Sequence, residues 1–104
     1  MTQPGVILTI LAPKQIENRL IDAVLDHGPI AASGFTSREV NGHGSAAVYR
    51  SVAEQVRART RLVEITIATT EANADSLIAQ IADALPGQLI TYYLCPLIRA
   101  GVIA

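Results

Sequence analysis

The chain has 104 residues and a formal net charge of −1 at pH 7, and half of its residues are hydrophobic. This length suffices for a single domain, residues 1–104, whose core needs neither disulfides nor a structural metal. The near-zero net charge gives no general attraction to nucleic acid or to a membrane surface, which excludes both as predicted partners. The high apolar content of so small a domain indicates that some apolar surface is buried between subunits.

A single cysteine, Cys95, rules out an intramolecular disulfide and any Cys-x-x-Cys metal site. Its apolar neighbours predict a buried side chain rather than a metal ligand. The first residues show no secretory signal, and no apolar run approaches the roughly 18 residues that a membrane-spanning helix needs. We therefore expect a cytoplasmic protein without direct membrane insertion.

The first part of the chain predicts a strand followed by a helix. Residues 6–12 are short, branched and nearly all apolar, which predicts a central strand covered on both faces. Pro13 suits the first turn of a helix, and Gly28-Pro29 is expected to end that helix. Its apolar residues recur at helical spacing, and they are Ile16, Leu20, Ile21, Val24 and Leu25.

A second strand and a long loop are expected next. Residues 30–40 are predicted to form the strand, and residues 41–60 the loop. His27, at the end of the preceding helix, is expected to interact with its terminal carbonyl groups.

The second half of the chain repeats the pattern of strand, helix and strand. Residues 62–69 alternate, with Val63, Ile65 and Ile67 on one face. Thr70 or Asn73 can cap the following helix. That helix is expected to end at Pro86-Gly87 and to be followed by a strand over residues 89–97.

The order β-α-β, long loop, β-α-β predicts an α+β fold, the ferredoxin-like split βαβ arrangement. In this fold both helices cover one face of an antiparallel sheet. The other face carries apolar side chains at several positions, either the set in residues 62–69 named above or its alternates. An exposed face of this kind favours a partner, which is a second reason to expect an oligomer.

One segment resembles the PII-like superfamily of signalling proteins, which includes the nitrogen-regulatory PII and CutA-like proteins. The family pattern Gly-x-Thr-x-x-Glu-Val-x-Gly-x-Gly falls without a gap on residues 34–44. The family's Tyr-Arg pair falls on Tyr49-Arg50, and its Val-Glu-Ile falls on residues 63–65. Residues 41–44, 51–56 and 92–97 are similar to a small subgroup encoded beside heavy-metal efflux systems, whereas other PII-like branches accompany bicarbonate transporters.

The resemblance implies a non-enzymatic homotrimer with a T-loop at about residues 41–60, which contacts a transporter or another partner protein. A small anionic ligand, such as an adenine nucleotide, would bind between subunits. The ligand-binding residues predicted in this way and from the local pattern are Thr36, Gly42, Gly44, Arg61 and Arg99. The residues predicted to contact the partner are Tyr49, Arg50, Arg57 and Arg59.

The residues themselves leave alternatives open. Gly42 and Gly44 can present backbone N–H groups to an anion, or they can simply shape a turn. The arginines of residues 50–61 can bind phosphate, dock an acidic partner or remain solvated. His43 could ligate a divalent transition metal, which would suit an accessory of a metal efflux system.

Two positions depart from nucleotide-binding PII proteins. The family's Gly-rich basic loop between the second helix and the fourth strand is here only Pro86-Gly87-Gln88, and Ala46 replaces the glutamine that helps to hold magnesium and 2-oxoglutarate.

No enzyme motif is present, which predicts that the protein is not an enzyme. A third hypothesis is a structural module whose loop recognises a partner.

Overall fold

The structure is a computed structural model that describes residues 3–44 and 59–104. Its elements are β1 (Val6–Pro13), the 3-10 helix η1 (Lys14–Ile16), α1 (Glu17–Leu25), α2 (Gly28–Ser33), β2 (Thr36–His43), β3 (Arg59–Thr69), α4 (Glu71–Ala84) and β4 (Thr91–Pro96). None of the helices described is both long and apolar enough to cross a membrane.

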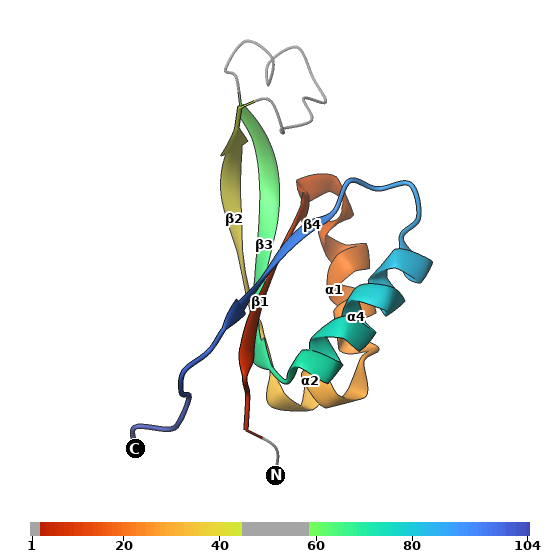
Figure 1. The fold of residues 1–104 in the computed structure, drawn as a ribbon. Helices are drawn as coiled ribbons and strands as arrows, with labels where there is room; N and C mark the ends of the chain where they lie inside the picture. The colour runs from red at the N-terminus through yellow and green to blue at the C-terminus, as the bar shows by residue number, and fades with distance from the viewer. Residues whose placement is uncertain (1–2, 45–58) are drawn as a thin grey trace.

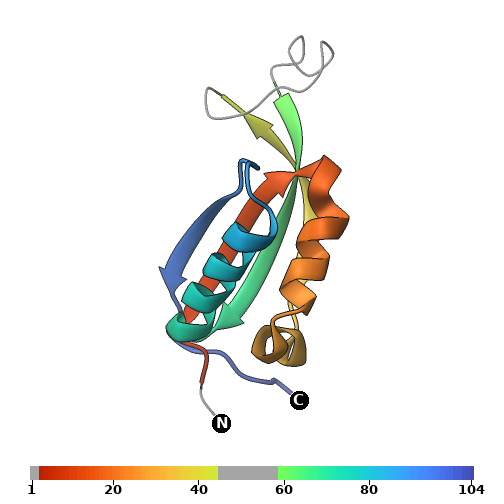
Figure 2. The same cartoon turned by 90° about the vertical axis from the view of Figure 1, so that its right-hand side faces the viewer.

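The four strands form one sheet in the order β2-β3-β1-β4, and every neighbouring pair is antiparallel. The helices lie together on one side of this sheet (Figures 1 and 2). The predicted α+β, ferredoxin-like arrangement is therefore confirmed. The long hairpin of β2 and β3 extends beyond the other strands at one end of the molecule (Figure 1).

The core lies between the sheet and the helices. Alternate residues of β1 are buried, because successive side chains of a strand point to opposite faces. The helix-facing residues of β3 are Val63, Ile65 and Ile67, each at most 1% exposed. The largest fully buried side chains are Leu8, Ile10, Leu20, Val24, Ile30, Val63, Ile65, Ile67 and Leu77.

The two long helices follow their sequence patterns closely. Leu20 and Val24 of α1 are fully buried, whereas Leu25 is 51% exposed, so the last predicted core position of this helix is wrong. The hydroxyl oxygen of Thr70 accepts a hydrogen bond from the backbone N–H of Asn73 at 3.1 Å. Thr70 is therefore the N-cap of α4, and Pro86-Gly87 follows the end of that helix as expected.

The predicted strand over residues 30–40 is wrong in its first part, because Gly28–Ser33 forms α2. Pro29 sits in the first turn, where the missing N–H costs nothing. His27 caps this helix instead of the preceding one: its Nδ1 accepts from the backbone N–H of Ile30 at 3.4 Å. Ile30 is fully buried against the core, and this burial favours a helical turn over an early strand.

The face of the sheet away from the helices, called here the open face, carries mixed side chains. The register places Thr36, Thr66, Thr9 and Tyr93 in one row across all four strands. Ile7 and Leu11 flank Thr9 on this face and are only half-buried, so β1 is fully covered on one face rather than on both. Val63, Ile65 and Ile67 face the helices. The residues between them in β3, Glu64 and Thr66, therefore lie on the open face.

Two further expectations need correction. The strands β2 and β3 extend to His43 and from Arg59, so both ends of the predicted loop of residues 41–60 are paired backbone. Cys95 is exposed rather than buried, because its pairing with Ile7 places it on the open face of an edge strand. Beyond β4, Ile98, Val102 and Ile103 are also exposed.

The core assignment can be tested with the same substitution at two positions of α1. Leu20→Ala removes a fully buried side chain and should lower the free energy of unfolding by about 2–5 kcal/mol. Leu25→Ala removes a half-exposed one and should cost less than about 1 kcal/mol. Urea unfolding at one fixed protein concentration measures both. Equal costs would contradict the packing of α1 described here.

Candidate functional site

The projecting end of the β2–β3 hairpin is the candidate site. Pairing of β1 with β3 ends at Pro13 and Leu62, whereas pairing of β2 with β3 continues to His43 and Arg59. Among the described strands, none lies beside the last residue pairs of the hairpin as a third strand. We call residues 39–44 and 59–62 the hairpin root.

Close packing explains the first glycine of the root. A Cβ atom on Gly42 would lie 2.7 Å from Cδ1 of Leu62 and 3.3 Å from Cγ2 of Thr60. Thr60 is only 2% exposed, so the open-face side of this rung is tightly filled. Gly44 has a φ of 92°, a conformation that other residues rarely adopt, and the chain leaves β2 there.

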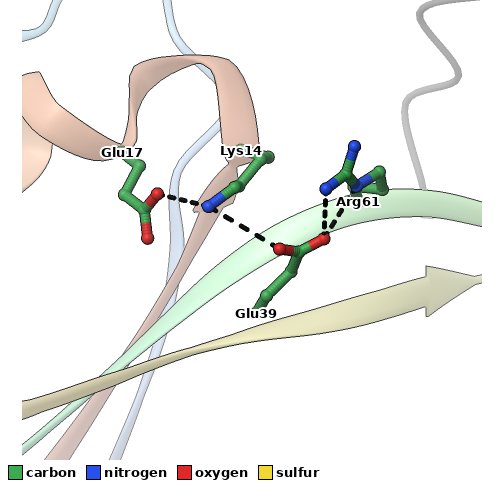
Figure 3. A network of polar contacts seen from close by, with 4 residues as sticks. All are labelled: Lys14, Glu17, Glu39 and Arg61. Carbon is green, nitrogen blue, oxygen red and sulfur yellow. Dashed lines mark hydrogen bonds and ion pairs between the residues drawn. The ribbon is translucent and has the colours of Figure 1, made fainter.

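A network of charged side chains lies on the helix-facing side of the root (Figure 3). Oε1 of Glu39 accepts a hydrogen bond from Nε of Arg61 at 2.7 Å and lies 2.7 Å from its Nη2. Oε2 of Glu39 lies 3.7 Å from Nζ of Lys14, which also donates to Glu17. The network thus joins the hairpin to η1 and α1, although all of its side chains retain solvent access.

These contacts shift two pKa values in opposite directions. The hydrogen bond from Arg61 lowers the pKa of the Glu39 carboxyl below its usual 4.5, and the charges of Arg61 and Lys14 act in the same direction against partial desolvation. The hydrogen bond with Glu17 raises the pKa of Lys14 above its usual 10.5, against the opposing effect of desolvation. Both charged forms are therefore favoured across the neutral range.

A second ion pair occupies the opposite face of the same two strands. Nε of Arg38 donates to Oε1 of Glu64 at 2.9 Å, and the two residues are direct cross-strand partners. Each side of the hairpin therefore holds one arginine against one glutamate.

The structure gathers only part of the predicted ligand-binding set within one chain. Gly42, Gly44 and Arg61 belong to the hairpin root. Thr36 begins β2, six residues before Gly42, which corresponds to roughly 20 Å along the strand. Arg99 follows β4, whose end pairs with the beginning of β1, so it lies toward the end of the sheet opposite the root (Figure 1).

Of the four residues predicted to contact a partner, only Arg59 lies within the described part of the chain. Tyr49, Arg50 and Arg57 lie outside the described residues, as does Ala46. Arg59 begins β3 and pairs through its backbone with His43.

His43 is exposed at the end of β2. Within residues 3–44 and 59–104, no group of three or more His, Cys, Asp or Glu residues is placed to hold a metal ion. The prediction of a metal at His43 therefore gains no ligand set from the described part of the chain.

A pocket that the sequence did not predict lies between α4 and β4. It has a volume of about 300 Å³, and its lining includes Ile78, Ile81, Gln88, Ile90 and Tyr92. The helical spacing of the two isoleucines in α4 indicated an apolar face, but the hollow depends on how α4 and the segment before β4 meet. The short Pro86-Gly87-Gln88 connection forms part of its wall.

Together, the antiparallel sheet, the helices on one face and the projecting β2–β3 hairpin define a ferredoxin-like fold of the PII-like type. Residues 2–104 match the family described as "Protein of unknown function (DUF3240)", and the chain belongs to this family. No curated protein matches the sequence.

Solved structures support the assignment of the fold. A DUF3240 family protein from Shewanella baltica has a TM-score of 0.77 at 14% identity, covering 99% of this chain and 100% of that one. A PII-like signalling protein from Thermus thermophilus has a TM-score of 0.62 at 23% identity, covering 91% and 88%. CPII from Thiomonas intermedia, a nitrogen regulatory PII-like protein bound to ADP, AMP and bicarbonate, has a TM-score of 0.67 at 15% identity, covering 95% and 97%.

The ion-pair network predicts how stability depends on pH. Because the folded-state pKa of Glu39 is lowered, its stabilising effect is present above about pH 4.5 and is lost as the pH falls through the lowered value. Glu39→Gln should therefore be less stable than wild type at neutral pH, and the difference should shrink as the pH falls below 4.5. Urea midpoints across this range measure it.

Asp75→Asn is the control, since it removes the same charge from an exposed position of α4. If the two variants show the same pH profile, the contribution of Glu39 is not specific to the network.

Proposed function

We propose that this chain is a PII-like regulatory protein that binds an adenine nucleotide between the subunits of a homotrimer. The observation that carries the proposal is the projecting β2–β3 hairpin, whose root combines Gly42, Gly44 and Arg61. The likeness to CPII, whose structures contain ADP and AMP, supports the choice of nucleotide.

The chemistry of the root suits a phosphate group. A guanidinium such as that of Arg61 presents several N–H donors in a plane and can bind phosphate oxygens in pairs. Gly44 carries no side chain, and no atom of the described residues lies within 4 Å of where its Cβ would stand. A small anion beside Arg61 can therefore approach the backbone of the root closely.

The distribution of the remaining residues favours a site shared between copies. Thr36 and Arg99 lie far from the root within one chain, so a second subunit would have to bring them to it. The open face offers the surface for this contact, because Ile7 and Leu11 are only half-buried and Tyr93 is 59% exposed. We infer that the open faces pack together in the trimer.

Regulation would depend on the segment that joins β2 to β3. A ligand can change its conformation only if it binds one state more tightly than another, and a ligand at the hairpin root is well placed to do so. We propose that the segment then contacts a transporter or another protein through Tyr49, Arg50, Arg57 and Arg59. The metal-binding alternative at His43 has no comparable supporting observation.

Nucleotide binding can be tested by calorimetry with ADP and AMP, with and without bicarbonate. Wild type should bind ADP, and Arg61→Gln should weaken binding by roughly 10- to 100-fold, because a charged hydrogen-bond donor to phosphate is lost. Arg19→Gln is the matched control, since it removes the same charge from an exposed position of α1.

The nucleotide proposal fails if wild type binds neither compound. The role of Arg61 fails if the two arginine variants bind alike.

The oligomeric state gives a separate test. Sedimentation should show a trimer for wild type and a folded monomer for Thr9→Arg, because three buried charges would then meet at the packed open faces. Ala79→Arg places the same charge on the exposed side of α4 and should remain trimeric. A monomeric wild type, or a trimeric Thr9→Arg variant, would contradict the packing proposed here.

A further inference from the structure

The guanidinium required by the proposed anion site already has an anionic partner. Both Nε and Nη2 of Arg61 lie 2.7 Å from the same oxygen of Glu39. These two nitrogens form one edge of the guanidinium, the kind of edge that a phosphate uses for paired hydrogen bonds. A phosphate at this edge and the carboxylate of Glu39 therefore compete for the same donors.

Glu39 has a second cation within reach. Its other carboxylate oxygen lies 3.7 Å from Nζ of Lys14, a separation typical of a loose ion pair. Lys14 comes from η1, outside the hairpin, and is held near the root by its hydrogen bond to Glu17 (Figure 3). If Arg61 turned to a ligand, the charge of Glu39 would still face a lysine.

The exposure of the pair permits such an exchange. The side chains of Glu39 and Arg61 are 42% and 61% exposed, so neither must leave a dry interior when the pair separates. Exposed ion pairs contribute little to stability, so thermal motion separates them often. The contact is therefore weak enough for a charged ligand to replace it.

We propose that Glu39 is an internal competitor that lowers the affinity of the anion site by occupying Arg61, and that Lys14 retains the carboxylate when a ligand replaces it. This inference rests on the proposed anion site and adds a residue that sets its affinity. Only molecules in which the ion pair is open can bind, so the apparent affinity equals the intrinsic affinity multiplied by the open fraction. The same factor applies to every anion that uses Arg61.

The test compares Glu39→Gln with wild type by calorimetry, using ADP and inorganic pyrophosphate as probes. The glutamine variant should bind both more tightly, by the same factor of roughly two to six, as expected for release of an exposed ion pair. Asp75→Asn makes the same change in net charge on α4 and should have a smaller effect on both probes. Circular dichroism checks that each variant is folded.

A double variant shows whether the effect passes through Arg61. In the Arg61→Gln background, Glu39→Gln should no longer raise the affinity for either probe. Persistence of the gain in that background would overturn the proposal, as would a gain equal to that of Asp75→Asn.

The competitor role and the anion site fail under different results. If wild type binds ADP through Arg61 but Glu39→Gln binds it no better, the competitor role is wrong and the proposed function stands. If neither wild type nor Glu39→Gln binds ADP or pyrophosphate, the anion site itself is wrong, and the inference is lost with it.

Discussion

The antiparallel pairing of β1 with β3 is the constraint on which the rest of the structure depends. It aligns Leu8 with Ile67 and Ile10 with Ile65, which places a continuous apolar surface on one face of the sheet. Burial of each such side chain contributes about 1.5–3 kcal/mol, so this face must be covered. The amphipathic helices α1 and α4 cover it. The residues that alternate with the buried ones along each strand then lie on the open face.

The candidate site is a consequence of unequal strand lengths. β3 has 11 residues and β1 has 8, so the β2–β3 hairpin continues where β1 has ended. Its last rungs are free of the third strand and can carry charge on one side and a tightly packed glycine on the other. The same fold therefore provides a base of packed strands and helices and a projecting end, and the proposed function uses that end for its ligand.

Charge in this molecule is organised by strand pairing rather than by net charge. The overall value of −1 hides two arginine–glutamate pairs within residues 3–44 and 59–104, one on each face of the hairpin. Each pair holds an arginine in place while neutralising it. The anion site that we propose needs no long-range attraction of anions, and its affinity would be set by how readily a ligand replaces the carboxylate of Glu39.

The sequence by itself determined the elements whose periodicity is strong. These include β1, α1, α4 and β3, because alternating or helical apolar spacing follows from burying one face. It did not determine α2, which depends on the His27 cap and on burial of Ile30 against other elements. The motif of residues 34–44 predicted a ligand site, but only the strand register separated Thr36 from Gly42 and paired Arg61 with Glu39. These relations are between residues distant in sequence, so tertiary structure alone could decide them.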